Sequence, residues 1–286
     1  MSLLDIQQLS VEIRQGRRVE NLLRDINLHV SAAEVVGLIG ESGAGKSMIT
    51  RAILDLLPAS AHITSGDILF ENAPLLIGGA RRNNHFIGRE ISFVPQDPLE
   101  SLNPVRRIGL QMTDLIRHSL RVRMTDARDR AHALLEEVSI RDAERVMQAY
   151  PHELSGGMRQ RVLIAMAFSV EPKLIIADEP TTALDVTVQK TVLALLQKLQ
   201  KKYNTSVLFI THDLGIVAKL CNRVTVLFDG YIVETTTLSD SMKPSAHPYT
   251  RALYDATLRY DQPDKPVRPI HNDIIQALRE ELEQRA

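Results

Sequence analysis

The sequence lacks tryptophan, has one cysteine, Cys221, among its 286 residues, and is only 4% aromatic. A single thiol excludes a disulfide framework within the chain and any metal site built from cysteines alone. This cysteine usage fits a reducing compartment. Cys221 lies in an apolar context, so we expect a small buried thiol with no catalytic role.

Neither sign of charge prevails, because 34 Lys and Arg stand against 35 Asp and Glu, a formal net charge of -1. This balance disfavours a protein that binds nucleic acid through bulk positive charge. Long apolar runs are also missing: the run at 162–168 is far below the ~20 residues that cross a bilayer. Residues 1–10 do not resemble a signal peptide. We expect a cytoplasmic protein, and 44% hydrophobic residues suffice for a sizeable core.

A strand, a glycine-rich loop and a helix are predicted in succession near the N-terminus. Residues 35–39 form a short apolar run, and residues 47–57 have helical spacing that stops before Pro58. The intervening string GESGAGKS has the phosphate-binding pattern. In this pattern backbone N–H groups surround the phosphate oxygens and the lysine reaches the β and γ phosphates. The serine hydroxyl ligates Mg²⁺. We expect nucleotide phosphates to be bound by Gly40, Glu41, Ser42, Gly43, Ala44, Gly45, Lys46, Ser47 and Met48.

Two carboxylates follow a second buried strand, predicted at residues 174–177. Open α/β sheets bind ligands at this end of their strands. We expect Asp178 to hold Mg²⁺ through water, and Glu179 to orient the attacking water or accept its proton. Together with the glycine loop, these residues predict phosphoryl transfer from a nucleotide.

A second anion site is predicted where Ser155, Gly156 and Gly157 precede the helix at 158–168. The string LSGGMRQR at 154–161 resembles the signature motif of ATP-binding cassette (ABC) ATPases. The resemblance implies that this motif meets the γ-phosphate of an ATP held by a partner subunit. Two ATP molecules would then lie between two subunits arranged head to tail.

The same resemblance implies roles for further residues. Gln96 matches the glutamine that senses Mg²⁺ and nucleotide and contacts the membrane subunit. Asp185, within Ala183-Leu184-Asp185, matches the loop that joins the two sites, and His212 matches the switch histidine near the γ-phosphate. The implied catalytic residues are therefore Lys46, Gln96, Glu179 and His212, and the implied Mg²⁺ ligands are Ser47, Gln96 and Asp178.

Two more strings, QDPLESLNP at 96–104 and HPYTRAL at 247–253, resemble the dipeptide, oligopeptide and nickel importer branch of ABC ATPases. The branch implies a subunit at the cytoplasmic face of the inner membrane that powers uptake of a small solute. Its implied partners are two permeases, a second ATPase subunit in a heterodimer or homodimer, and indirectly a substrate-binding protein. The alternative is a soluble ABC ATPase acting on nucleic acid or the ribosome, which the charge balance and the lack of a second cassette or long coiled-coil insert disfavour.

The expected fold is α/β, the P-loop NTPase fold of ABC ATPases with a mixed β core. We expect the ATPase domain at 1–260, with an inserted helical subdomain at about 97–170 in which Thr125 caps a helix. The polar stretch at 78–85 is predicted to be a loop. A proline-containing linker and a short C-terminal helix are expected at 261–286, with Ile274, Ile275, Leu278 and Leu282 covering the chain's own surface.

An aromatic residue on which family members stack adenine is missing, since residues 1–69 contain no Phe, Tyr or Trp. Its place corresponds to Ile13 and Arg14. Either Arg14 or Arg17 stacks on the base as a planar cation, or Ile13 makes apolar contact alone, and both alternatives predict weak discrimination between ATP and GTP. We also expect no iron–sulfur cluster, because the cysteine-bearing extension of many branch members is lacking.

Overall fold

The computed structural model describes residues 2–16, 18–77, 80–81, 86–182, 184–241, 246–257 and 270–285. The chain divides into two compact units, one made of residues 1–83 and 209–286 and the other of residues 84–208. Within the described ranges, no helix has the length and apolar character needed to span a membrane.

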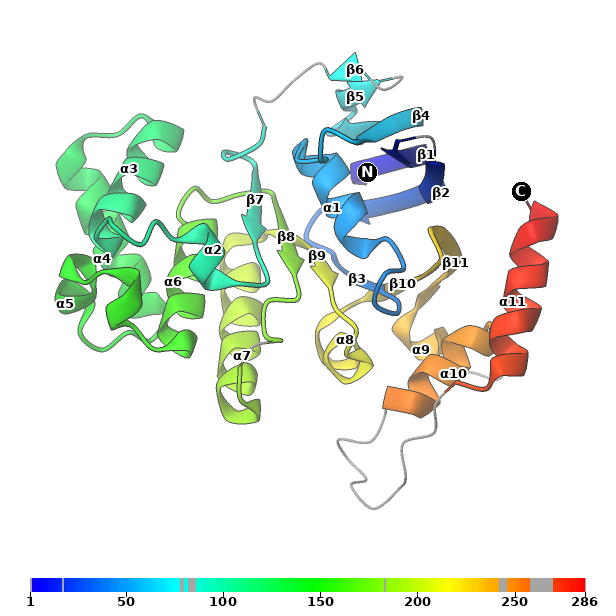
Figure 1. Cartoon of the computed structure of the whole chain (residues 1–286). Helices are drawn as coiled ribbons and strands as arrows, with labels where there is room; N and C mark the ends of the chain where they lie inside the picture. The colour runs from blue at the N-terminus through cyan, green and yellow to red at the C-terminus, as the bar shows by residue number, and fades with distance from the viewer. Residues whose placement is uncertain are drawn as a thin grey trace. The chain divides into compact units, whose positions relative to one another are not determined.

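An antiparallel sheet forms the N-terminal part of the first unit, with strand order β2-β1-β4-β5-β6 (Figure 1). Its strands are β1 (Ser2–Gln15), β2 (Arg18–Ser31), β4 (Ala61–Phe70), β5 (Ala73–Ile77) and β6 (Ala80–Arg81). The register of β1 against β2 shifts between Ile6 and Val11, which interrupts the alternation of apolar residues. For this reason the sequence pattern predicts strands only at residues 9–13 and 26–30 within β1 and β2.

The loop predicted at 78–85 is wrong at Ala80 and Arg81, which pair with β5 as a short edge strand. An edge strand of two residues has no apolar alternation by which to detect it. Residues 78, 79 and 82–85 lie outside the described part of the chain.

The parallel part of the first unit contains β3 (Val35–Ile39), the end of β9 (Ser206–Ile210), β10 (Arg223–Phe228) and β11 (Tyr231–Thr237). β10 pairs in parallel with β3 and antiparallel with β11, with which it forms a hairpin around Asp229 and Gly230. The helices of this unit are α1 (Lys46–Leu54), α8 (Leu214–Leu220), α9 (Leu238–Ser241), α10 (Pro248–Thr257) and α11 (Asn272–Arg285).

The thiol of Cys221 is buried where α8 ends, as predicted, and burial raises its pKa to about 12. The C-terminal helix α11 buries Leu278 and Leu282, and Ile274 and Ile275 are half-buried. This helix covers its own chain, as its amphipathic pattern predicts. The linker prolines Pro263, Pro266 and Pro269 lie outside the described ranges, and the domain boundary near residue 260 stays a prediction.

The second unit places parallel strands β7 (Ile91–Val94) and β8 (Leu174–Asp178) beside the first residues of β9. The helical insert consists of α2 (Pro98–Ser101), α3 (Ile108–Leu120), α4 (Met124–Glu137), α5 (Ala143–Gln148), the 3₁₀ turn η1 (Pro151–Glu153) and α6 (Gly156–Phe168). Helix α7 (Val186–Tyr203) follows β8.

Thr125 does not cap α4, because the helix begins at Met124 and Arg123 occupies the cap position. The Thr125 hydroxyl donates instead to Asp126 Oδ1 at 3.2 Å. The guanidinium of Arg123 bonds the same carboxylate through two nitrogens. This ion pair is exposed, so it adds little to the stability of the first turn.

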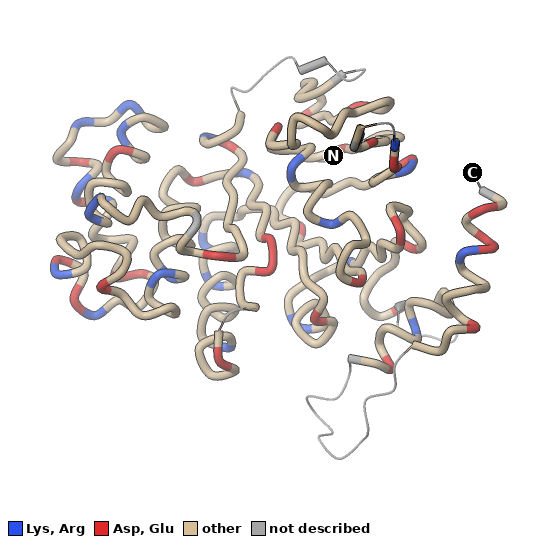
Figure 2. Tube along the Cα trace, in the orientation of Figure 1, with Lys and Arg blue, Asp and Glu red and all other residues tan. Residues whose placement is uncertain are grey.

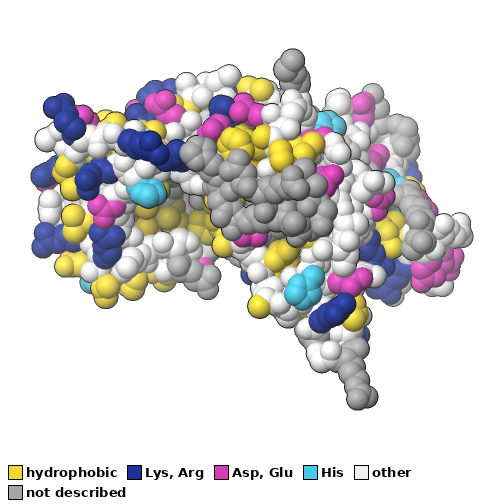
Figure 3. Space-filling model, turned by 90° about the horizontal axis from the view of Figure 1, so that it is seen from above, with side chains coloured by type: hydrophobic (Ala, Val, Ile, Leu, Met, Phe, Trp, Pro, Cys, Tyr) yellow, Lys and Arg dark blue, Asp and Glu magenta, His cyan; other side chains and the backbone are white. Residues whose placement is uncertain are grey.

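Arginine and lysine side chains gather over the helices α3 to α5 (Figures 2 and 3). Several of them form ion pairs on the surface, among them Arg128 with Glu144 at 2.8 Å. Both side chains of that pair are more than half exposed, at 56% and 57%, so it contributes little to stability.

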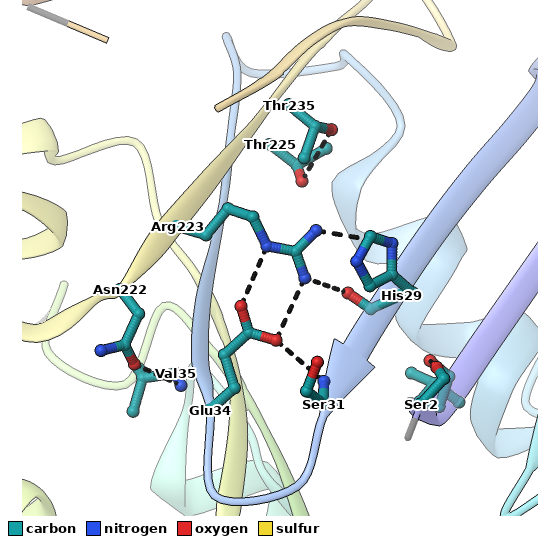
Figure 4. Close-up of polar contacts among 10 residues, drawn as sticks. Ser2, His29, Ser31, Glu34, Val35, Asn222, Arg223, Thr225 and Thr235 are labelled. Carbon is teal, nitrogen blue, oxygen red and sulfur yellow. Dashed lines mark hydrogen bonds and ion pairs between the residues drawn. The ribbon is translucent and has the colours of Figure 1, made fainter. Parts of the chain in front are cut away.

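A cluster of polar contacts ties the start of β10 to the turn between β2 and β3 (Figure 4). Arg223 Nε and Nη2 donate to the two carboxylate oxygens of Glu34 at 2.9 and 3.1 Å, and Nη2 also donates to the His29 carbonyl at 2.7 Å. Both paired side chains are largely buried, 14% and 17% exposed. Burial alone would raise the pKa of Glu34, but the hydrogen bonds from Arg223 and Ser31 outweigh it and lower the pKa.

A carboxylate whose pKa is lowered on folding stabilises the protein above its unfolded pKa, and that stabilisation disappears as pH falls through the folded pKa. We therefore expect Arg223→Met to lower the free energy of unfolding by about 1–3 kcal/mol near neutral pH, since it leaves Glu34 buried without its cation. The loss should shrink when Glu34 is protonated. Urea unfolding at neutral and acidic pH measures both effects, with the exposed Arg141→Met as control. An equal loss of unfolding free energy at both pH values would contradict the stabilising role of the pair formed by Glu34 and Arg223.

Candidate nucleotide-binding site

The loop at residues 40–45 joins β3 to α1 in the first unit, as predicted. Lys46 opens α1, and its Nζ donates to the carbonyl oxygens of Gly40 at 2.8 Å and Glu41 at 2.9 Å. The lysine side chain is only 7% exposed, whereas Ser42, Gly43 and Ser47 are exposed. The ammonium group is thus held inside the loop while much of the loop's outer surface faces solvent.

The loop packs so closely that side chains cannot replace two of its glycines. A Cβ atom at Gly40 would lie 2.3 Å from the Leu227 carbonyl oxygen, and one at Gly45 would lie 2.8 Å from Leu23 Cδ2. Gly45 also has a φ of 108°, in the left-handed region that favours glycine. Its neighbour Ala44 accepts a hydrogen bond from the Gly230 N–H at 3.0 Å. The loop shape therefore depends on β2 and on the turn between β10 and β11.

The carboxylates predicted in the second unit lie where β8 ends. Asp178 is the last residue of β8, and Glu179 follows with a φ of 45°. A glutamate in this left-handed region is strained, and such strain concentrates at functional sites. Both residues are half-buried.

Gln96, predicted from a separate string, contacts Glu179. Its Nε2 donates to Glu179 Oε2 at 3.3 Å, and Thr182 Oγ1 donates to the same oxygen at 2.9 Å. Two donors on one oxygen restrict the orientation of this carboxylate. Sequence reasoning missed Thr182; the available signal was a hydroxyl three residues after a candidate catalytic acid.

The signature residues lie at the N-terminus of α6. Ser155 caps the helix, since its Oγ accepts the Met158 N–H at 3.3 Å. A Cβ at Gly157 would lie 2.6 Å from Val188 Cγ1, so glycine permits the close packing of α6 against α7. A cavity of about 440 Å³ opens between these helix starts, lined by Ser155, Gly156, Gly157, Arg161, Asp185 and Thr187 among others.

Asp185 caps α7, since its Oδ1 accepts the backbone N–H groups of Thr187 at 3.0 Å and Val188 at 2.9 Å. The structure therefore places Asp185 and the signature residues around one cavity within the second unit. Ala183, in the same predicted loop, lies outside the described residues.

His212 lies in the first unit, between β9 and α8, and is exposed. Its predecessor Thr211 donates its N–H to the carbonyl of Leu38 at 3.2 Å, and Leu38 belongs to the strand that leads into the phosphate-binding loop. Asp213 Oδ1 caps α8 by accepting the Gly215 N–H at 2.8 Å. These contacts fix the backbone on both sides of His212.

At the place expected for adenine, Arg14 is exposed and Ile13 is half-buried near the end of β1. The Arg14 N–H donates to the Ser60 carbonyl at 2.8 Å. The other candidate, Arg17, lies outside the described part of the chain. Both ways of holding the base therefore stay open.

A strand, a close-packed glycine loop and a lysine at the start of a helix define a P-loop nucleotide-binding protein. The model of the family described as ABC transporter matches residues 23–182. The chain belongs to this family and is one of its ATPases.

The curated relatives agree with this assignment. The probable D,D-dipeptide transport ATP-binding protein DdpD of Escherichia coli is 44% identical, over 91% of this chain and 80% of the relative. The oligopeptide transport ATP-binding protein OppD of Bacillus subtilis is 43% identical, over 88% of this chain and 70% of the relative. The sequence thus resembles the dipeptide and oligopeptide branch, as the two strings predicted.

Solved structures confirm the predicted fold. A dimeric post-hydrolysis state of the ATP-binding cassette MJ0796, bound to ADP and Pi, has a TM-score of 0.71 and 26% identity. The match covers 82% of this chain and 98% of that one.

Replacing Thr182 by valine should show whether its hydroxyl orients Glu179. We expect Thr182→Val to lower kcat for ATP hydrolysis about three- to tenfold, the effect of one lost hydrogen bond, with little change in KM for ATP. Steady-state kinetics measure both constants. Thr64→Val, an exposed threonine on β4, serves as control. A kcat equal to that of the control would contradict the role of Thr182.

Proposed function

We propose that the chain is the ATP-hydrolysing subunit of an importer of peptides, or of nickel or a similar small solute. It acts at the cytoplasmic face of the inner membrane, where it associates peripherally with two permeases and a second ATPase subunit. A substrate-binding protein is an indirect partner. The observation that carries the proposal is the 44% and 43% identity to transport ATP-binding proteins for D,D-dipeptides and oligopeptides. The cargo named for these relatives supports peptides, and nickel rests on the resemblance of the strings alone.

The proposed reaction is hydrolysis of the γ-phosphate of ATP. The oxygen of a water molecule attacks the γ-phosphorus, the bond to the bridging oxygen breaks, and ADP leaves. Glu179, oriented by Gln96 and Thr182, accepts the proton of that water. The cation of Lys46 stabilises charge on the β and γ phosphates, and His212 contacts the γ-phosphate.

The residues proposed to hold Mg²⁺ are Ser47, Gln96 and Asp178. They offer a hydroxyl, an amide oxygen and a carboxylate, the oxygen donors that this cation prefers. Gln96 uses its amide N–H toward Glu179, so its oxygen is the atom suited to the cation. When bound, Mg²⁺ neutralises charge that develops on the phosphates. Among the described residues no group of three His, Cys, Asp or Glu could hold a metal, so such a cation would depend on phosphate oxygens and water for its other ligands.

We propose that two ATPase subunits close around two ATP molecules, each held by the loop of one subunit and the signature residues of the other. The open cavity at Ser155, Gly156 and Gly157 supports this arrangement, because it offers backbone N–H groups at the start of α6. ATP closes the pair because it binds the closed state more tightly, and hydrolysis removes that preference. The permeases respond to this movement.

Glu179→Gln should bind ATP but stall hydrolysis, because the amide cannot accept the proton of water. We expect an ATP-dependent dimer of about twice the monomer mass in gel filtration, with the second ATPase subunit co-expressed if the chain alone stays monomeric. Glu283→Gln, on the exposed side of α11, should behave like the unmodified chain. Unimpaired steady-state turnover by Glu179→Gln would show that this carboxylate does not activate water.

Affinity purification from detergent-solubilised membranes tests the importer role directly. We expect two permease subunits and a second ATPase to be recovered with the tagged chain. Recovery of ribosomes or DNA in place of membrane subunits would instead support a soluble ABC ATPase and contradict the proposal.

A further inference from the structure

The phosphate-binding loop is supported from behind by the turn that joins β10 to β11. Gly230 in this turn donates its N–H to Ala44 O at 3.0 Å, and the Leu227 carbonyl oxygen would lie 2.3 Å from a Cβ at Gly40. The Gly230 carbonyl accepts the Arg24 N–H at 2.8 Å. A shift of this turn would therefore move the backbone that shapes the loop.

Helix α10 holds the same turn from its other side. The ring of Tyr249 meets that of Phe228 edge to face, with centroids 5.0 Å apart and planes at 70°. Both rings are buried, with Tyr249 0% and Phe228 5% exposed. Burial, and to a lesser extent the negative charge of Glu41, raise the pKa of Tyr249. Its hydroxyl has no hydrogen-bond partner among the described residues, so the ring supplies the contact.

His247 fixes the start of α10 through three contacts. Its Nδ1 accepts the Tyr249 N–H at 3.1 Å, and its own N–H donates to Glu234 Oε2 on β11 at 3.1 Å. With Nδ1 as acceptor, the ring proton of neutral His247 lies on Nε2. Nε2 is 3.1 Å from Glu281 Oε2 and donates to it.

Glu281 belongs to the C-terminal helix α11, which lies beside α10 (Figure 1). The buried side chains of Leu278 and Leu282 anchor α11 on either side of Glu281. Contacts therefore continue from α11 through His247, Tyr249 and Phe228 to the turn behind the phosphate-binding loop. All of these residues lie in the first unit.

We propose that α11 positions the phosphate-binding loop through Glu281, His247 and Tyr249, so that this helix sets the affinity of the chain for ATP. The inference rests on the proposed function, since it assumes that the loop binds ATP. His247, Tyr249 and Glu281 are positioning residues, because they act through the turn and not on the nucleotide.

Isothermal titration of the full chain with Mg-ATP, well below its unfolding temperature, tests the inference. We expect Glu281→Ala to weaken ATP binding about threefold or more, within the range of coupling through packed networks. Glu280→Ala is the matched control, because Glu280 is an exposed neighbour on the same helix and its carboxylate accepts a hydrogen bond from Gln276 within that helix. The double variant with His247→Ala and Glu281→Ala should bind ATP no more weakly than His247→Ala alone. Both substitutions break the same contact between His247 and Glu281.

Two variants of Tyr249 separate positioning from general stability. Tyr249→Phe keeps the ring and should bind ATP as the unmodified chain does, whereas Tyr249→Leu should bind more weakly. Should Tyr249→Leu fail to fold, Glu281→Ala still decides, because the Glu281 side chain is 41% exposed. A merely structural role would lower the melting temperature without moving the Kd.

The outcomes distinguish the inference from the proposed function. Equal Kd values for Glu281→Ala and Glu280→Ala, with normal binding by the unmodified chain, overturn the positioning role alone. Failure of the unmodified chain to bind Mg-ATP overturns the proposed function, and the inference with it.

Discussion

The close approach of two backbone segments, at Gly40 and at the Leu227 carbonyl, is the constraint on which the phosphate-binding loop depends. A Cβ atom at Gly40 would lie 2.3 Å from the Leu227 carbonyl oxygen, so this position has room for glycine and no other residue. Tight packing at Gly40 and Gly45 holds the two ends of the loop in place, which favours backbone dipoles that are oriented before a phosphate arrives. The Lys46 ammonium is held by two carbonyl oxygens of the same loop, and in the proposed mechanism this cation stabilises the phosphate charge.

A second constraint applies to Glu179. Its left-handed backbone and the two hydrogen bonds to Oε2 restrict both ends of the side chain. Water activation requires such a fixed carboxylate, since misplacement of a catalytic group by about 1 Å can lower a rate a hundredfold. Gln96 links this carboxylate to the segment that precedes the helical insert, so in the proposed mechanism the insert is coupled to the reacting groups.

The best predicted elements are those whose local pattern is complete. The buried strand at Val35–Ile39 matches its predicted range, and β8 extends the predicted range 174–177 by one residue, because a short apolar run bounded by polar or turn residues has little room for error. The glycine loop and the signature string could be recognised in the sequence because each is a fixed string, and their nucleotide-binding roles stay predictions. Thr182 and the contact of His247 with Glu281 were missed because they depend on tertiary packing, and residues 34 positions apart show no local pattern. The edge strand at Ala80 and Arg81 was missed for the same reason, since pairing with a neighbour creates it.

The most direct test of the account is the affinity of the full chain for Mg-ATP with and without the Lys46 ammonium, measured by isothermal titration. The account predicts that Lys46→Ala loses at least about tenfold in affinity, because a charge-assisted contact to phosphate contributes ~1.5–3 kcal/mol. Binding by Lys46→Ala as tight as that of the unmodified chain would contradict the assignment of residues 40–47 as the phosphate-binding loop.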